Sequence, residues 1–495
     1  MPTPFEKKSI RNLGIYGIIR PATVDDYLIP EGAVTEAVNV NFDRIGAVTV
    51  RPGITTLGAT IQAGYPIWGL HNTQSGSMMA VISQGASARV YAYAGASWLS
   101  SLADGTANVR TRFLEAGGRT IVLNFGSATT MYSSVRFFST ADTWVTTGNP
   151  INPQAITDQV ARSVQPRFGE VYKSRIYLAG GNTNGTNIDS SRLWYSNVIS
   201  AAGNFAWTPT ADFVDINPND GENITGLKRY ALKLLVFKPN NIYQFSTAGV
   251  DPDPLIKVGT RSNESIIEGK KGLYFHHDSG FYRYTGAYPT DISRPISDIV
   301  QAITYANYLT ISSWKDDNNI YWNVGDLTID GNSLDWRNCV VRYTESSEVW
   351  TVYSYPNEVP FASTYDTGAA LSRVLGLDNG VVATLNSGTT DLREPIKYRM
   401  ITKWYEWEGV ENRKIIQEFI ALCEKAQETR LMYQTDGNIE WNDLGQLKKY
   451  LNYFKQLNIK FHRIRFKVSG TSRDEAPIFL GLEITKGTNE GPVEQ

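Results

Sequence analysis

The chain lacks any apolar run long enough to cross a membrane. A membrane-spanning helix needs about 20 consecutive apolar residues, whereas the most apolar stretch, residues 232–237, is short and contains Lys233. The N-terminus, MPTPFEKKSIRNLG, has no apolar core of the kind that defines a signal peptide. We therefore expect a soluble protein with no membrane span, made in a reducing cytoplasm.

Cysteine and histidine are scarce, which argues against a metal centre or a disulfide framework. The two cysteines, Cys339 and Cys423, lie far apart and inside apolar strand-like runs, so we expect buried thiols. There are four histidines, and two of them, His276 and His277, are adjacent. Neighbouring side chains in a strand point to opposite faces, so these two cannot chelate one ion together.

The sequence also lacks a charge excess and a catalytic motif. Its 47 Lys and Arg against 49 Asp and Glu give a net charge of −2, so no overall field favours nucleic acid or anionic membranes. The pairs Asp25-Asp26 and Asp316-Asp317 fit turn chemistry better than a glycosidase pair, whose carboxyls stand ~5–10 Å apart. No nucleophile elbow, phosphate loop or His-Glu-x-x-His helix occurs, and a sialidase-type box is matched once, without its glycine, at residues 139–144. We expect no catalytic residue, metal or cofactor, and thus no enzyme.

Aromatic residues and glycine are abundant, which favours short strands joined by turns. The chain has 27 Tyr, 19 Phe, 12 Trp and 42 Gly. The clearest unit is KKGLYFHHDSGFYRYTG, residues 270–286, where two runs of β-formers flank Asp278-Ser279-Gly280. This pattern predicts a β-hairpin.

Similar two-run units recur between residues 67 and 390. We count about seven, spaced at roughly 40–50 residues, which is the period of propeller blades. Each unit leaves apolar faces uncovered, so the units must pack around a ring. The sequence therefore predicts a mainly β protein whose central part is a β-propeller of about six to seven blades.

Composition divides the rest of the chain. We predict an extended N-terminal arm over residues 1–66 with a hairpin at residues 37–50, the propeller over 67–392, a C-terminal β-sandwich platform over 393–487, and a frayed tail over 488–495. Helical spacing of apolar residues occurs at 158–164 and 295–305. The segment 444–457 interrupts the strand pattern and is expected to be a short amphipathic helix or a loop-borne insertion.

A mildly basic cluster with interleaved aromatics lies near the C-terminus. A solvated face is the more common reason for such a cluster, but this composition is also typical of a surface that binds nucleic acid or an acidic partner. The candidate docking residues are Lys448, Lys449, Tyr450, Lys455, Arg463 and Arg465.

The N-terminal segment carries a recognisable set of residues: Pro30, Gly32, Asn39, Phe42, Asp43, Gly46, Arg51, Pro52 and Gly53. With Leu193-Trp194-Tyr195-Ser196 and the pattern over 224–246, they resemble the tail-nozzle or tail-hub (packaged DNA stabilisation) propeller proteins of short-tailed bacteriophages. This resemblance implies a structural virion protein of the tail, assembled in the host cytoplasm, that forms a ring, a homohexamer. The ring would lie below the portal and its head-to-tail adaptor ring, contact other tail proteins such as fibres or a needle, and let genomic DNA pass through its lumen without sequence-specific binding. The family supplies no catalytic residue.

The alternative function is a propeller that binds glycans or hydrolyses glycosides. Tryptophans in blade loops stack on sugars in such proteins, although core anchoring is the more common role of a tryptophan. The candidates are Trp98, Trp144, Trp207 and Trp314.

Overall fold

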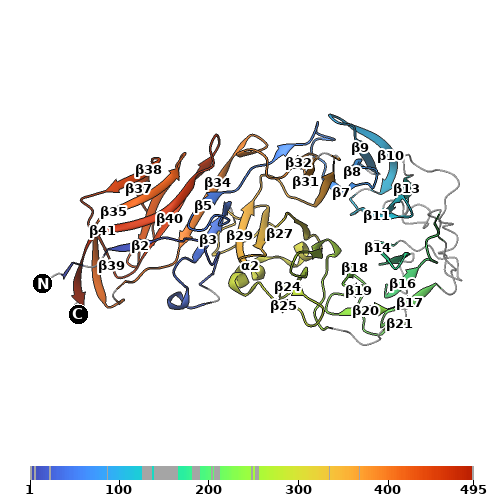
Figure 1. Cartoon of the computed structure of the whole chain (residues 1–495), viewed down its shortest axis with the longest axis horizontal. Coiled ribbons are helices and arrows are strands. Elements are labelled where there is room, and N and C mark those ends of the chain that lie inside the picture. Colours follow the sequence, from blue (N-terminus) through green and yellow to red (C-terminus); the bar gives the residue numbers. More distant parts are fainter. Residues whose placement is uncertain are drawn as a thin grey trace.

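The computed structural model describes most of the chain as strands. It describes residues 3–4, 7–21, 24–85, 87–106, 108–124, 136–138, 166–180, 190–201, 205, 212–246, 249–250, 256–333, 335–366, 368, 370–407 and 409–492. Strands make up 51% and helices 5%, which confirms the mainly β class. Figure 1 shows a ring of small sheets on one side and a pair of larger sheets on the other.

Five separate four-stranded antiparallel sheets form a β-propeller. They are β7 (Ile67–Asn72), β8 (Met78–Gln84), β9 (Ser87–Tyr93) and β10 (Trp98–Thr106); β14 (Phe168–Tyr172), β15 (Arg175–Ala179), β16 (Arg192–Tyr195) and β17 (Phe213–Asp215); β18 (Gly226–Tyr230), β19 (Lys233–Phe237), β20 (Ile242–Ser246) and β21 (Gly249–Val250); β22 (Ile267–Glu268), β23 (Leu273–His277), β24 (Gly280–Tyr284) and β25 (Thr290–Asp291); and β30 (Phe361–Asp366), β31 (Leu371–Gly376), β32 (Val382–Thr384) and β6 (Thr55–Thr56). The hairpin expected at 270–286 is confirmed, since β23 and β24 pair with His277 opposite Gly280.

The blade count differs from the expected six to seven, because two of the anticipated units are not separate four-stranded sheets. One has three described strands, β11 (Arg112–Ala116), β12 (Arg119–Leu123) and β13 (Arg136–Phe138). The other, β26 (Ser312–Lys315), β27 (Asn319–Gly325), β28 (Cys339–Thr344) and β29 (Val349–Ser354), is part of a ten-stranded sheet. Both occupy places in the ring, since β11 contacts β7 and β14, and β26 contacts β22 and β30.

The ten-stranded sheet continues from β29 out of the ring. It adds β3 (Val34–Val38), β34 (Glu394–Thr402), β40 (Ile464–Ser472), β36 (Arg430–Thr435) and β37 (Asn442–Gln446), with β33 (Thr390–Asp391) beside β34. Strand β3 lies parallel to β29 and antiparallel to β34. One hydrogen-bonded sheet thus joins the propeller to the C-terminal part.

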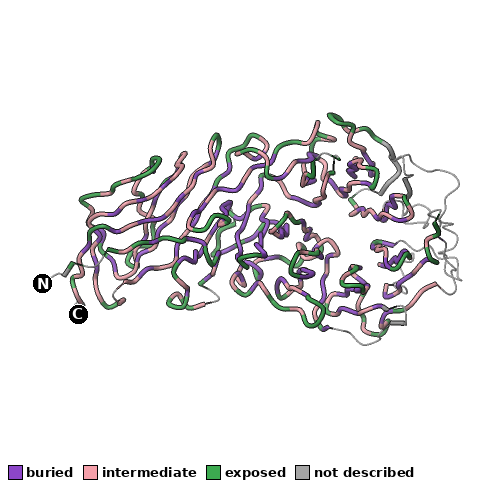
Figure 2. The backbone as a smooth tube through the Cα atoms, in the orientation of Figure 1, coloured by how far each residue is buried: buried purple, intermediate pink, exposed green. Residues whose placement is uncertain are grey.

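An eight-stranded sheet faces this C-terminal half. It contains β38 (Tyr450–Phe454), β35 (Asn412–Lys425), β41 (Ile478–Pro492), β5 (Val48–Val50), β4 (Val40–Asn41), β1 (Thr3–Pro4), β2 (Lys8–Ile10) and β39 (Ile459–Phe461). Phe419 of β35 packs edge-on against Phe466 of β40, with ring centroids 6.1 Å apart. Buried residues run through both parts of the molecule (Figure 2).

The N-terminal segment is not an extended arm, which corrects the expectation for residues 1–66. Strands β1 and β2 pair with β41, β3 enters the ten-stranded sheet, and β6 completes the sheet of β30–β32. The physical reason is that this segment carries apolar residues, among them Ile10, Val34 and Val38, that are almost fully buried. Within it, β4 and β5 pair as the expected hairpin.

Two C-terminal expectations are wrong. Residues 444–457 form no helix; β37 and β38 occupy the two sheet edges, and Tyr450, with a φ of +73°, begins β38. The tail is paired rather than frayed through residue 492, since Asn412 lies opposite Pro492 and Lys414 opposite Asn489. The helix expected at 295–305 is present as η5 (Arg294–Ile296) and α2 (Ser297–Ala302), followed by α3 (Tyr305–Tyr308); residues 158–164 lie outside the described part.

Candidate functional site

The signature residues lie where the N-terminal segment meets β29 and β34. The Arg51 side chain is fully buried, and its guanidinium donates to Asp391 twice, Nη1 to Oδ1 at 2.8 Å and Nη2 to Oδ2 at 2.5 Å. It also lies over the Tyr355 ring, 4.3 Å from the centroid. Burial lowers the pKa of Arg51, but Asp391 and the nearby tyrosines outweigh this and raise it, so the guanidinium stays charged.

Asn39 links the same arginine to two strands. Its Oδ1 accepts from Arg51 Nε and from the backbone N–H of Ser354, both at 2.8 Å, and its Nδ2 donates to Lys397 O at 2.7 Å. Its φ of +58° is in the left-handed region that Asn tolerates better than most residues. Asn39 therefore holds β29, β34 and Arg51 together.

The other signature residues shape the same junction. The Asp43 carboxylate accepts from Arg342 Nη2 at 2.5 Å, and Arg342 is buried in β28. A Cβ at Gly53 would lie 2.0 Å from Thr390 O, and one at Gly32 2.9 Å from Asn12 O. The other four residues support turns and the core. Pro30 O accepts from Ala33 N–H, and Pro52 O accepts from Arg51 Nη1. Phe42 packs against the largest hydrophobic core cluster, and Gly46 has a φ of +77°. The signature is thus a structural junction.

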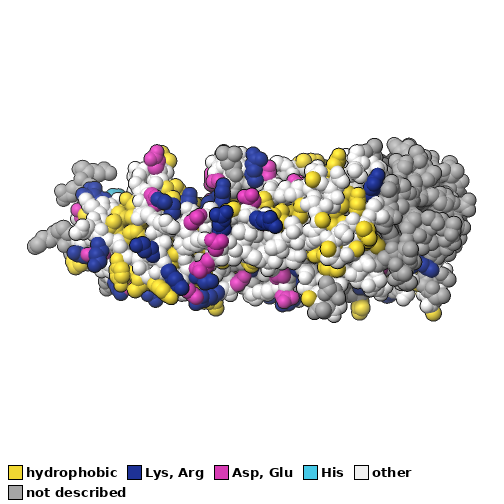
Figure 3. All heavy atoms as spheres, turned by 90° about the horizontal axis from the view of Figure 1, so that it is seen from above, with side chains coloured by type: hydrophobic (Ala, Val, Ile, Leu, Met, Phe, Trp, Pro, Cys, Tyr) yellow, Lys and Arg dark blue, Asp and Glu magenta, His cyan; other side chains and the backbone are white. Residues whose placement is uncertain are grey.

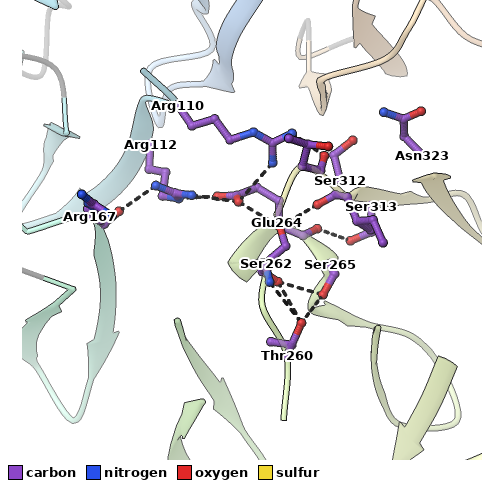
Figure 4. A network of polar contacts seen from close by, with 12 residues as sticks. Arg110, Arg112, Arg167, Thr260, Ser262, Glu264, Ser265, Ser312, Ser313 and Asn323 are labelled. Atoms are coloured by element: carbon purple, nitrogen blue, oxygen red, sulfur yellow. Dashed lines mark hydrogen bonds and ion pairs between the residues drawn. The ribbon is translucent and has the colours of Figure 1, made fainter. Parts of the chain in front are cut away.

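A second polar centre lies on the inner side of the propeller, around Glu264 in the 3-10 helix η4 (Asn263–Ser265) (Figure 4). Arg112 of β11 donates to both Glu264 oxygens, from Nε and, at 2.9 Å, from Nη2. Arg110 Nη1 lies 3.4 Å from Oε2, and Arg110 Nη2 donates to Thr310 O. In the ring, the sheets of β14 and β18 lie between β11 and η4, so Arg112 and Glu264 connect sheets that are not neighbours.

The electrostatics of this centre favour a permanent carboxylate. Burial opposes ionisation of Glu264, but Arg112, its hydrogen bonds and Arg110 outweigh burial and lower the pKa of the carboxyl to about 2. Burial lowers the pKa of Arg110, and Arg112 lowers it further against the attraction of Glu264. Burial and Arg112 also lower the pKa of Arg167. Two guanidiniums thus converge on the Glu264 carboxylate, and Arg167 accepts from Arg112 through its backbone oxygen.

A cavity of about 420 Å³ opens beside Glu264. Its wall comes from β18, η4, β22, β26 and β30, and it includes Lys228, Glu268, Lys315 and Phe361. Lys315 Nζ donates to Glu268 O at 2.5 Å. Arg110 stacks over Phe361, 5.1 Å from the ring centroid, so the arginine cluster adjoins the cavity.

The candidate docking residues fall into two groups on different sheets. Lys448, Lys449, Tyr450 and Lys455 lie at or beside β38, an outer strand of the eight-stranded sheet, where Tyr450, Leu451 and Tyr453 are exposed. Arg463 and Arg465 lie at β40 of the other sheet, and both stack on Trp404, at 5.5 and 4.5 Å. Figure 3 shows Lys and Arg side chains next to hydrophobic ones over this end of the molecule.

Neither of the two described tryptophans suggested as sugar platforms is fully exposed. Trp314 is 4% exposed and stacks on Tyr321, with centroids 5.5 Å apart. Trp98 is half-buried, and its Nε1 donates to Leu57 O at 3.3 Å. Trp144 and Trp207 lie outside the described residues.

Asp316 and the two cysteines have structural roles. Asp316 Oδ1 accepts from the N–H groups of Asn318 and Asn319, which confirms the turn. Cys339 and Cys423 are buried free thiols, as expected, and burial raises the pKa of Cys423 to about 12. Among the described residues, no three His, Cys, Asp or Glu side chains gather as metal ligands. Nor does this part of the chain contain a helix long and apolar enough to span a membrane.

Sequence reasoning missed the Glu264 centre. Arg110 and Arg112 are two residues apart, so an extended backbone places them on one face, and this spacing was the available signal. Glu264 is 152 residues from Arg112, and no local pattern connects them.

Comparisons with known proteins leave the family open. No protein-family model matches the chain, and no curated protein sequence matches it. Among solved structures, the extracellular domain of a one-component system from B. thetaiotaomicron aligns with 88% of this chain at 10% sequence identity and a TM-score of 0.43. The chain spans 59% of the length of that structure. A likeness this weak does not indicate a function.

Proposed function

We propose that the chain is a structural protein of the tail of a short-tailed phage, a nozzle or hub subunit that forms a ring below the portal and adaptor. In this role it closes the filled head and conducts DNA during ejection. Its partners are further copies of itself, as a homohexamer, the adaptor ring, and other tail proteins such as fibres or a needle. Its location is the virion.

One observation carries most of this proposal: the two parts of the chain are joined through a continuous sheet. Domains within a chain are usually connected by flexible linkers and move relative to each other. Here β29 of the propeller, β3 and β34 are hydrogen-bonded neighbours, and the buried Arg51–Asp391 pair closes the same junction. A subunit that must withstand a pressurised genome benefits from such a rigid connection.

The Glu264 centre determines where DNA passes in this proposal. Arg112 and Glu264 meet on the inner side of the propeller, so their side chains obstruct a passage through it. The DNA path therefore lies between subunits, and only an assembled ring supplies it. A near-neutral chain suits a conduit, since a strongly cationic wall would hold DNA by counterion release.

Electron microscopy of the purified chain, alone and mixed with the adaptor ring of its phage, tests the proposal. We expect rings with an open centre that stack coaxially on the adaptor. Persistent monomers that do not bind the adaptor would contradict it.

The alternative, a glycan-binding propeller or glycoside hydrolase, has less support. Trp314 is buried, and Trp98 is half-buried with its ring centroid 5.1 Å from that of Tyr93, so neither ring is fully exposed. A glycan array together with a hydrolase panel tests this alternative, and saturable binding of one glycan would favour it.

A further inference from the structure

The cavity beside Glu264 has a charge pattern that its own residues do not satisfy. Lys228 of β18 is half-buried in its wall, and among the described residues it has no ion-pair partner. Lys315 is exposed, and its Nζ donates to a backbone carbonyl, Glu268 O, with no carboxylate partner among the described residues. Two lysines of the wall are therefore without a bound carboxylate in the part of the chain that the structure describes.

The arginines next to the cavity are also incompletely satisfied. Arg110 has five N–H donors, and its described acceptors are Thr310 O and, at 3.4 Å, Glu264 Oε2. Its Nε is buried without a hydrogen-bond partner in the described structure. Buried donors are normally paired, so the guanidinium has an N–H group free to donate to a further oxygen.

Cations outnumber carboxylates around this space. The cations are Lys228, Lys315, Arg110 and Arg112, and the carboxylates are Glu264, Glu268 and Glu358. Arg112 already neutralises Glu264. These residues therefore carry an excess of one positive charge, and the partial burial of the cavity weakens solvent screening.

The remaining wall is mixed: Asn263, Ser312 and Ser313 are polar, and the other residues form an apolar patch. Ile266 and Phe361 are 7% exposed and line the cavity beside Ala362. A volume of about 420 Å³ is within the range of small-molecule sites and exceeds that of a bare inorganic ion.

We propose that this cavity is a binding site for an organic anion, a phosphate or carboxylate group carried on an apolar body. The anionic group lies between Lys228, Lys315 and Arg110, and the body packs against Ile266 and Phe361. This site goes beyond the proposed tail function and does not depend on it.

Isothermal titration calorimetry of the full chain tests the site with phenyl phosphate, benzoate, inorganic phosphate and phenol. We expect phenyl phosphate or benzoate to bind saturably, inorganic phosphate more weakly because it lacks the body, and phenol not at all. The tighter of the two aromatic anions identifies the anionic group. Affinity falls as salt is added, because the attraction is electrostatic.

Three single substitutions localise the binding. Lys228→Gln removes an unpaired cation and lowers affinity about tenfold, whereas Glu268→Gln removes a repelling carboxylate and raises it. Lys257→Gln is the matched control, since Lys257 is exposed and outside the cavity. Thermal unfolding confirms that each variant is folded. An absence of saturable binding of either aromatic anion, or equal loss in Lys228→Gln and Lys257→Gln, would overturn the proposal.

Discussion

Arg51 and Asp391 form a paired hydrogen bond in which the arginine side chain is completely buried and the carboxylate is 5% exposed. The two residues are 340 positions apart. Arg51 follows β5 near the N-terminus, and Asp391 ends β33 beside the first long strand of the C-terminal part. This pair therefore fixes the N-terminal segment to the connection between the two parts of the molecule.

Breaking this pair should destabilise the whole chain. Asp391→Asn leaves a buried guanidinium without its counter-charge, so we expect the free energy of unfolding to fall by about 3–5 kcal/mol. Urea denaturation followed by tryptophan fluorescence measures the change. The exposed pair Arg44–Glu424 is the control, and Glu424→Gln should cost less than ~1 kcal/mol. Equal losses of unfolding free energy in the two variants would show that the burial of Arg51 does not raise the cost of breaking its ion pair.

Gly53 should not tolerate a side chain. Its backbone approaches Thr390, and a Cβ would lie 2.0 Å from Thr390 O, so Gly53→Ala must shift the backbone of the junction. We expect a loss of about 1–3 kcal/mol or more, in line with other overpacked sites. Gly437→Ala is the matched control, because Gly437 is exposed and a Cβ there meets nothing within 4 Å. Differential scanning calorimetry should therefore give a lower melting temperature for Gly53→Ala than for Gly437→Ala. Equal melting temperatures would contradict the close approach of Gly53 to Thr390.

Elements that depend on local chemistry were predictable from the sequence. The hairpin of β23 and β24 follows from its β-formers and the Asp278-Ser279-Gly280 turn, and the turn at Asp316 follows from its neighbouring Asp and Asn residues. Burial of both cysteines followed from their apolar surroundings.

Elements that depend on distant partners were not predictable. Thr55 and Thr56 are β-formers, but two residues are too short a run to predict a strand; they complete a blade because β32 offers a free edge. The segment 444–457 has apolar residues at helical spacing, but its strands β37 and β38 are fixed by pairing with β36 and β35. In residues 444–457, hydrogen bonds to distant strands outweighed the local helical pattern. The Glu264 centre was missed because its residues are also distant in sequence, with 152 positions between Arg112 and Glu264.

The Glu264 carboxylate should make the free energy of unfolding depend on pH in the acid range. Its pKa falls from 4.5 to about 2 on folding, so its contribution is fully present above pH 4.5 and is lost as the pH falls towards 2. We expect Glu264→Gln to be less stable than the unsubstituted chain at pH 7 by roughly 2–4 kcal/mol, with the two curves converging near pH 2. Chemical denaturation at several pH values tests this expectation. A constant difference from pH 7 to pH 2 would contradict the lowered pKa.

His276 should produce a second acid effect in a higher pH window. Burial lowers the pKa of His276 from 6.5 to about 3, and its Nε2 has no hydrogen-bond partner in the described structure. The neutral ring is therefore fully favourable above pH 6.5, and stability falls as the pH drops towards 3, because only the unfolded chain gains the proton. His276→Leu should remove this loss while changing stability at pH 8 by less than ~1.5 kcal/mol. If the variant and the unsubstituted chain lose stability in parallel between pH 6.5 and 5, His276 does not cause the effect.

The exposed lysines beside β38 test the candidate docking surface. Lys449 and Lys455 lie over the exposed rings of Tyr450 and Tyr453, at 5.0 and 5.8 Å, and in the described structure neither pairs with a carboxylate. Because both are exposed, the double substitution Lys449→Glu and Lys455→Glu should change the melting temperature little.

The functional effect of the same double substitution should be large if an acidic partner docks at β38. Charge reversal replaces attraction by repulsion at the rim of the interface, so we expect slower association, with a rate that rises as added salt screens the repulsion. Mass photometry of ring formation and pull-down with the adaptor ring measure it. The matched control reverses Lys257 and Lys270, two exposed lysines of the propeller. If both double variants assemble as the unsubstituted chain does, the lysines beside β38 are a solvated face and the docking surface lies elsewhere.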